Sequence, residues 1–175
     1  PSILRENQKD LEASSTLSDA LKDRLRLDPS RISAMAEAVD RIALQPDPLG
    51  SIVEERTLPS GIHLQKRRVP IGVILVIYES RPNVTCDAAA LCFKAGNAVI
   101  LRGGKESAHS NRAIVASIQS VLGTIGLSDA VGFVDSPDRS AIDALVQMDG
   151  IIDLAIPRGG PALMKAVTHS ATIPV

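Results

Sequence analysis

Two short stretches of the sequence combine a basic residue with a pair of glycines, and each follows an apolar run. They are Arg102-Gly-Gly-Lys105 and Pro157-Arg-Gly-Gly160. Glycines let backbone N–H groups approach a phosphate closely, and arginine or lysine adds full charge. A single glycine pair is more often a plain turn, whereas two such loops at the ends of parallel strands suit an anionic ligand. Both interpretations stay open from the residues alone.

Two familiar nucleotide motifs are absent from the sequence. There is no GxGxxG fingerprint, so an ordinary Rossmann dinucleotide site does not follow from motif alone. The absence of GxxxxGK[ST] disfavours an NTPase. A third polar stretch, Tyr78 to Asn83 (YESRPN), contains Arg81, whose guanidinium matches an acyl phosphate or a carboxylate. The alternative is that Arg81 pairs with Glu79 or with a helix end.

The elements around these loops predict an α/β fold. Val73 to Ile77 is apolar without alternation, which is typical of a strand that is buried on both faces. Val84 to Ala95 is expected to be a helix, with Gly96 in the left-handed position after its end. Ala98 to Leu101 is a second apolar strand. In an open parallel sheet, ligands bind outside the carboxyl ends of the strands, which is where the polar loops stand.

The remaining chain falls into three parts. Residues 1–50 form an N-terminal helical segment, with Asp28-Pro29 as a helix start. Residues 51–69 contain two extended runs around Pro59-Ser-Gly61, which predicts a β-hairpin. Residues 70–175 alternate strands and helices, which predicts a Rossmann-like parallel sheet with flanking helices. Two further strands are expected at Val131 to Asp135 and Ile151 to Ile156. Two further helices are expected at Arg139 to Met148 and Pro161 to Val167.

Composition excludes several function classes. The net charge of −1 gives no general attraction to nucleic acid or membranes, and the aromatic content of 2% argues against base stacking. No apolar run approaches the roughly 18 residues of a membrane span, and the first residues do not resemble a signal peptide. Cys86 and Cys92 lie on one predicted helix, about 9 Å apart, so we expect free thiols and a reducing, cytoplasmic location. The three histidines are too scattered to predict a metal site: His63, His109 and His169.

VIYESRPNVT followed by LCFKAGNAVILRGGKE resembles the γ-glutamyl phosphate reductase family, also called glutamate-5-semialdehyde dehydrogenase, within the aldehyde dehydrogenase superfamily. The segments LDPSRISAMAEAVDRIALQPDPLG, DLAIPRGG and ATIPV extend the resemblance over nearly the whole chain. It implies the NADPH-dependent reduction of L-glutamate 5-phosphate (γ-glutamyl phosphate) to L-glutamate 5-semialdehyde and phosphate, in L-proline biosynthesis. It also implies an aldehyde dehydrogenase-like cofactor-binding domain, a homo-oligomer that uses the hairpin as an arm, and glutamate 5-kinase as an upstream partner.

The resemblance also implies roles for individual residues. Arg102 stands at the position of a lysine that binds the adenosine ribose, and Lys105 stands near the position of an acid that is common in NAD enzymes. Two cations without an acid favour NADPH over NADH. Further residues match the cofactor site: Gly103, Gly104, Ser136, Pro137, Pro157, Arg158, Gly159 and Gly160. The loop between the cofactor and the reacting carbonyl matches Glu79, Ser80, Arg81 and Asn83, and the oxyanion donor of the superfamily aligns with Ser80 or Arg81.

The family mechanism needs a cysteine thiolate that attacks the acyl phosphate. In the family that cysteine follows soon after the IPV segment, so we expect it beyond Val175 and no catalytic residue within this chain. The family also has residues ahead of this start. Cys86 and Cys92 do not match the nucleophile, and we expect them to pack as small apolar side chains. The chain alone is then an inactive cofactor-binding part without the catalytic domain. The alternatives are another aldehyde dehydrogenase and a non-catalytic nucleotide-binding or assembly module.

Overall fold

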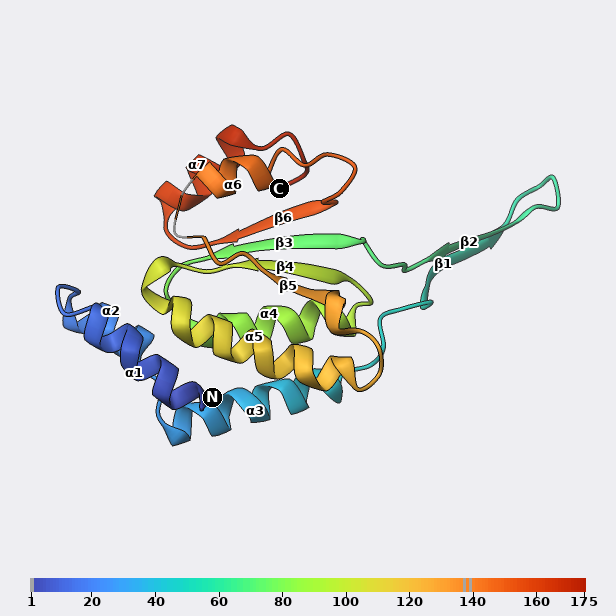
Figure 1. Cartoon of the computed structure of the whole chain (residues 1–175). Helices are drawn as coiled ribbons and strands as arrows, with labels where there is room; N and C mark the ends of the chain where they lie inside the picture. The colour runs from blue at the N-terminus through green and yellow to red at the C-terminus, as the bar shows by residue number, and fades with distance from the viewer. Residues whose placement is uncertain (1, 137, 139) are drawn as a thin grey trace.

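A computed structural model describes residues 2–136, 138 and 140–175 of the chain. Its centre is a four-stranded parallel sheet in the order β5-β4-β3-β6, with helices on both faces (Figure 1). The strands are β3 (Val73–Tyr78), β4 (Ala98–Arg102), β5 (Val131–Phe133) and β6 (Leu154–Arg158). This confirms the predicted α/β class with a Rossmann-like parallel sheet.

Strand β3 is buried on both faces, which explains its unbroken apolar run. Ile74, Val76 and Tyr78 belong to one hydrophobic core, and Leu75 and Ile77 belong to another on the opposite face. Successive side chains of a strand point to opposite faces, so a strand between two helical layers needs apolar residues at every position. The helices of these layers are α4 (Pro82–Lys94), α5 (Ala108–Gly123), α6 (Ser140–Leu145) and α7 (Pro161–Ser170).

The entry into β3 requires a glycine. Gly72 has φ +129°, and a Cβ built there would overlap the carboxylate of Asp153, which accepts a hydrogen bond of 2.8 Å from the N–H of Val73. We expect Gly72→Ala to lower the free energy of unfolding by about 2 kcal/mol, because it combines backbone strain with loss of this hydrogen bond. Urea unfolding followed by circular dichroism measures the change.

Gly123 provides the matched control for that substitution. It lies at the end of α5 without a positive φ, and a Cβ built there meets nothing within 4 Å. Gly123→Ala is therefore expected to leave stability unchanged or to raise it by up to about 1 kcal/mol. Equal effects of the two substitutions would contradict the conformational argument for Gly72.

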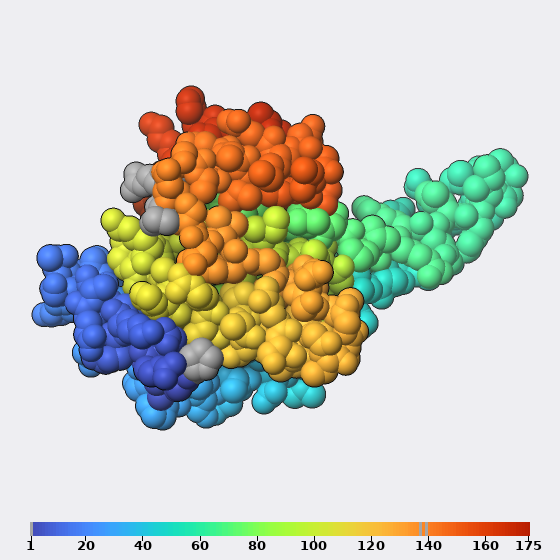
Figure 2. Space-filling model, viewed as in Figure 1, coloured from blue at the N-terminus to red at the C-terminus, as the bar shows by residue number. Residues whose placement is uncertain are grey.

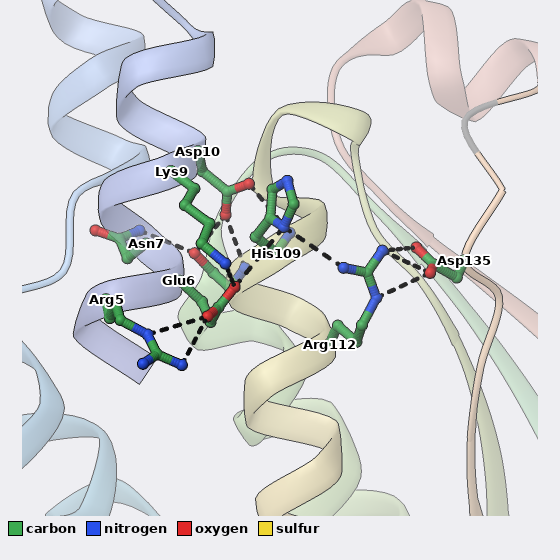
Figure 3. A network of polar contacts seen from close by, with 9 residues as sticks. Arg5, Glu6, Asn7, Lys9, Asp10, His109, Arg112 and Asp135 are labelled. Atoms are coloured by element: carbon green, nitrogen blue, oxygen red, sulfur yellow. Dashed lines mark hydrogen bonds and ion pairs between the residues drawn. The ribbon is translucent and has the colours of Figure 1, made fainter. Parts of the chain in front are cut away.

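Three helices form the N-terminal layer: α1 (Ile3–Ala13), α2 (Asp19–Leu25) and α3 (Pro29–Ala43). The carboxylate of Asp28 accepts from the N–H of Arg31 at 2.8 Å, which confirms Asp28 as the N-cap of α3. Helix α3 packs on α4, and α1 packs on α5. At the second contact the buried carboxylate of Asp10 accepts from the N–H groups of His109 and Ser110 and from the Ser110 hydroxyl (Figure 3). The layer is thus joined to the sheet through the first turn of α5.

The predicted hairpin is confirmed as an antiparallel pair of β1 (Ile52–Thr57) and β2 (His63–Arg67). It projects away from the body of the molecule as an arm, which the green atoms in Figure 2 show clearly. All six residues of β1 are exposed. None of the helices in the described part of the chain is long and apolar enough to cross a membrane.

Two strand predictions were wrong in their bounds. The strand expected at Ile151 to Ile156 runs from Leu154 to Arg158, because the N–H groups of Ile151 and Ile152 bond to the Met148 carbonyl and form a turn. Pro157 has no N–H to donate to a neighbouring strand. It is tolerated within β6 because β6 is an edge strand of the sheet. Strand β5 ends at Phe133 rather than at residue 135.

Candidate cofactor and substrate site

A cleft of about 470 Å³ opens at the carboxyl ends of the parallel strands. Its walls come from the ends of β3 and β4, the loop that follows β4, and helices α6 and α7. Five residues that the sequence singled out line it: Glu79, Ser80, Arg102, Gly104 and Lys105. The loops that follow β3 and β4 therefore meet at one edge of the sheet, as expected of an open parallel sheet, whereas no residue from Pro157 to Gly160 lines this cleft.

Arg102 forms part of the wall of the cleft rather than a loose cation in it. Its side chain is buried, with a residue exposure of 7%. The guanidinium donates to the carbonyls of Ser136 at 3.4 Å, Asp138 at 3.3 Å and Gly103 at 3.2 Å. Arg102 thus ties the segment after β5 to the loop after β4. Pro137, which was also predicted to contact the cofactor, lies outside the described residues.

The glycine loop after β4 is held in place by buried polar side chains at the start of α5. A Cβ at Gly103 would overlap the amide of Asn111 and come within 2.9 Å of the Tyr78 ring, so the close approach requires glycine. The Asn111 amide donates to Ser107 Oγ at 2.9 Å, and Ser107 Oγ donates to the Gly104 carbonyl at 3.1 Å. These contacts keep the loop in one conformation before any ligand arrives.

Glu79 joins the end of β3 to the second glycine loop. Its carboxylate accepts from the N–H of Gly160 at 2.8 Å, at the N-terminus of α7. Pro157 and Arg158 lie within β6, opposite Ile77 and Tyr78 of β3. A Cβ on Gly159 would come within 2.7 Å of the Glu79 carboxylate, so the loop passes close to this acid. A carboxylate therefore already lies on the backbone N–H that was predicted to face a phosphate.

Two acidic residues of the cleft were not predicted. Glu106 follows Lys105 in the sequence, lines the cleft and accepts from Ser80 Oγ at 2.5 Å. Asp143 reaches the same cleft from α6. The proximity of Glu106 to Lys105 was visible in LRGGKE, whereas nothing in the sequence indicates that α6 turns Asp143 toward the cleft. Lys105 remains the exposed cation at the rim.

Arg81 and Asn83 lie apart from this cleft. They line a separate hollow of about 380 Å³ between the N-terminal helices and the start of α4. The segment from Glu79 to Asn83 therefore separates two hollows, with Glu79 and Ser80 on one side and Arg81 and Asn83 on the other. Arg81 forms no ion pair with Glu79 or with any other residue that the structure describes.

Both cysteines have environments that suppress their reactivity. Burial raises the pKa of Cys92 to about 11, and burial together with the charge of Asp87 raises the pKa of Cys86. A raised pKa lowers the thiolate fraction at neutral pH, and the thiolate is the nucleophile. Among the described residues, no group of three His, Cys, Asp or Glu side chains is placed to hold a metal ion.

We expect Cys92 to react with a disulfide reagent at pH 7.5 at least about tenfold more slowly than free cysteine, whose pKa is about 8.5, and Cys86 also to react more slowly. The rate should rise with pH through the range from 8 to 11 as the thiolate forms. Stopped-flow absorbance on the native chain measures it, with the urea-unfolded chain as the control. A native rate equal to the unfolded rate would contradict the effect of burial.

Comparison with known proteins identifies the relatives of the chain. No family model matches it. The γ-glutamyl phosphate reductase of Magnetococcus marinus is 53% identical over 174 residues, which cover 97% of this chain and 41% of that protein. The crystal structure of γ-glutamyl phosphate reductase from Thermotoga maritima superposes with a TM-score of 0.95 at 37% identity, over 99% of this chain and 42% of that one. The chain is a homologue of γ-glutamyl phosphate reductase.

These similarities confirm the resemblance to γ-glutamyl phosphate reductase that the sequence indicated. The chain spans about two fifths of the length of the curated γ-glutamyl phosphate reductases it matches. More distant structures share the fold alone. An engineered glycolyl-CoA reductase with bound NADP⁺ superposes with a TM-score of 0.61 at 17% identity. The fold is thus that of the aldehyde dehydrogenase-like enzymes.

Proposed function

We propose that the chain forms the nicotinamide-cofactor-binding part of a γ-glutamyl phosphate reductase. The reaction is the NADPH-dependent reduction of L-glutamate 5-phosphate to L-glutamate 5-semialdehyde and phosphate, in proline biosynthesis. The observation that carries the proposal is the cleft at the carboxyl ends of β3 and β4, with the rigid glycine loop and Lys105 on its rim. Its volume lies within the range of about 300–1,000 Å³ that is typical of small-molecule sites.

The residues of the cleft fit a dinucleotide. A Cβ on Gly104 would come within 2.5 Å of Ser80 Oγ, so glycine lets the loop after β4 pass close to the loop after β3. Lys105 is exposed at the rim and would contact a 2′-phosphate, while Arg102 donates to the carbonyls of Ser136 and Asp138 in the segment that would border the adenine side. The Arg158 to Gly160 loop and the N-terminus of α7 would face the pyrophosphate, where Glu79 now accepts from Gly160. NADPH supplies the hydride when it is bound.

The substrate side of the site is the segment from Ser80 to Asn83. The oxyanion donor of the superfamily aligns with Ser80 or Arg81, and the Ser80 hydroxyl donates to Glu106 in this structure. A shift of Glu106 would release this hydroxyl toward a reacting carbonyl. The nucleophile would be the family cysteine that follows the IPV segment, since burial raises the pKa of the Cys86 and Cys92 thiols and lowers their thiolate fraction. The chain alone is therefore expected to bind cofactor without turning over substrate.

The proposed cellular setting follows from the reaction. Glutamate 5-kinase would supply γ-glutamyl phosphate in the cytoplasm. The arm of β1 and β2 would pair copies of the protein, because an isolated two-stranded hairpin is marginally stable in water and this one exposes Val53 at 53% and Ile62 at 59%. Analytical ultracentrifugation tests the arm, since Val53→Asp should shift the protein toward the monomer.

Two measurements test the proposed function. Calorimetric titration of the 175-residue chain with NADPH and NADH should give binding that favours NADPH. In a second experiment, the chain replaces the aligned segment of the Magnetococcus marinus reductase, and the chimera should reduce γ-glutamyl phosphate with NADPH. Binding without activity of the chimera would favour a non-catalytic nucleotide-binding module. Activity on other acyl substrates but not on γ-glutamyl phosphate would favour another aldehyde dehydrogenase.

A further inference from the structure

The hollow on the far side of the Glu79 to Asn83 segment has an unusual density of charge. It measures about 380 Å³ and lies between α2, the start of α3 and the start of α4. Six of its lining residues are charged: Arg24, Arg26, Arg31, Arg81, Asp23 and Asp87. Four arginines and two aspartates therefore contribute to the lining of one small space. Like charges brought together in this way repel, and a bound anion relieves the repulsion.

The internal ion pairs of the hollow leave most of this positive charge uncompensated. Arg31 binds Asp23 through an ion pair of 2.6 Å and donates to the carbonyl of Arg26 at 2.9 Å. These contacts neutralise Asp23 and occupy Arg31. The side chains of Arg24, Arg26 and Arg81 form no hydrogen bond or ion pair with any residue in the described part of the chain. Three guanidinium groups are therefore left to meet a ligand.

Asp87 gives the hollow a second chemical character. It lies one turn after Asn83 on α4, and its Oδ2 accepts from the Asn83 amide at 3.2 Å. Its Oδ1 has no donor among the described residues, and Asp87 lines the hollow, so the carboxylate keeps acceptor capacity there. A site with several cations and one available carboxylate complements a zwitterion that carries a carboxylate and an ammonium group. Phosphate alone would gain from the arginines but would be repelled by Asp87.

We propose that this hollow binds the α-amino-acid end of the substrate. Arg81, together with Arg24 and Arg26, binds the α-carboxylate, and Asp87 binds the α-ammonium group. The assignment rests on the proposed reductase function, and the short segment from Glu79 to Asn83 lines this hollow on one side and the cofactor cleft on the other. A substrate whose acyl end lies near Ser80 then has its amino-acid end on the Arg81 side. The N-terminal helices, which are remote in sequence from the cleft, thereby take part in substrate recognition.

Titration with three stable probes tests this assignment. The 175-residue chain is titrated with L-glutamate, glutarate and inorganic phosphate, and binding is followed by proton–nitrogen NMR. L-glutamate should bind about tenfold more tightly than glutarate, which lacks the ammonium group, and phosphate should not displace it at equal concentration. A phosphate that binds more tightly than L-glutamate would overturn the amino-acid assignment.

Substitutions separate the two charges of the proposed ligand. Arg81→Gln should raise the Kd for L-glutamate at least about tenfold, and Arg24→Gln provides a second, exposed variant with an effect in the same direction. Asp87→Asn should abolish the preference for L-glutamate over glutarate, because it removes the partner of the ammonium group and also the carboxylate that repels glutarate. Arg68→Gln, in the exposed segment beside the arm, is the control and should change nothing.

The Kd for NADPH distinguishes failure of this proposal from failure of the proposed function. A chain that binds NADPH but not L-glutamate would overturn the assignment of the hollow alone. Binding of L-glutamate that is unaffected by both arginine substitutions would also overturn it. If L-glutamate binds as expected but neither nicotinamide cofactor binds, the hollow stands as an amino-acid site and the reductase proposal falls.

Discussion

Replacing Lys105 with glutamate is expected to lower the affinity of the chain for NADPH by about 100-fold, with a change of less than about threefold for NADH. Lys105 is exposed at the rim of the cleft, whereas Arg102 is buried and bonded to backbone carbonyls. Lys105 is therefore the cation that we propose as the partner of a 2′-phosphate. Glutamate at this position removes a charge-assisted contact and adds repulsion, yet a carboxylate is also the group that binds the free ribose hydroxyl of NADH.

Calorimetric titration with both cofactors at one fixed ionic strength measures the effect, since contacts to a phosphate weaken with salt. Lys66→Glu is the matched control, because it makes the same charge change on the exposed arm, away from the cleft. An equal loss of affinity for NADPH and NADH would show that Lys105 contacts a part common to both cofactors. If Lys105→Glu leaves the Kd for NADPH unchanged, a residue other than Lys105 binds the 2′-phosphate.

The central unit of the fold was predictable because its signals are local. The unbroken apolar run of β3 reports burial on both faces, and Gly96 ends α4 with φ +73° as the sequence indicates. Parallel strands of this kind place their following loops at one edge, so the meeting of the loops after β3 and β4 also follows from the order of elements. The same reasoning placed Ser80, Gly104 and Lys105 in one cleft.

The features of the site that the sequence did not predict depend on contacts between segments that are distant in the sequence. Arg102 reads as an exposed cation in LRGGK, but the segment after β5 covers it and uses its donors. Arg24 and Arg26 belong to an amphipathic helical segment, and only the packing of the N-terminal layer on α4 brings them beside Arg81. Nothing local in the sequence records which helix faces which, so the second hollow could not be predicted.

Asp10 is the clearest case of a long-range contact, and its removal is expected to have the largest effect on stability. The side chain is 2% exposed and accepts from the N–H of His109 at 3.0 Å, from the N–H of Ser110 at 2.7 Å and from the Ser110 hydroxyl at 2.5 Å (Figure 3). Asp10→Ala leaves these donors without an acceptor in a buried contact. We expect the free energy of unfolding to fall by about 3 kcal/mol.

Urea unfolding of the 175-residue chain, followed by circular dichroism, measures this change. Glu12→Ala is the matched control, because Glu12 is exposed on the same helix and bonds only to Gln8 among the described residues. Its effect should stay within about 0.5 kcal/mol. The form of the transition also discriminates. Since α1 supplies an acceptor for the first turn of α5, the N-terminal layer and the sheet should unfold in a single transition that Asp10→Ala moves as a whole. The contrary result is that Asp10→Ala shifts only a minor early phase of unfolding and leaves the main transition unchanged. That result would show that the N-terminal layer folds independently of the sheet and that the Asp10 contacts do not couple the two.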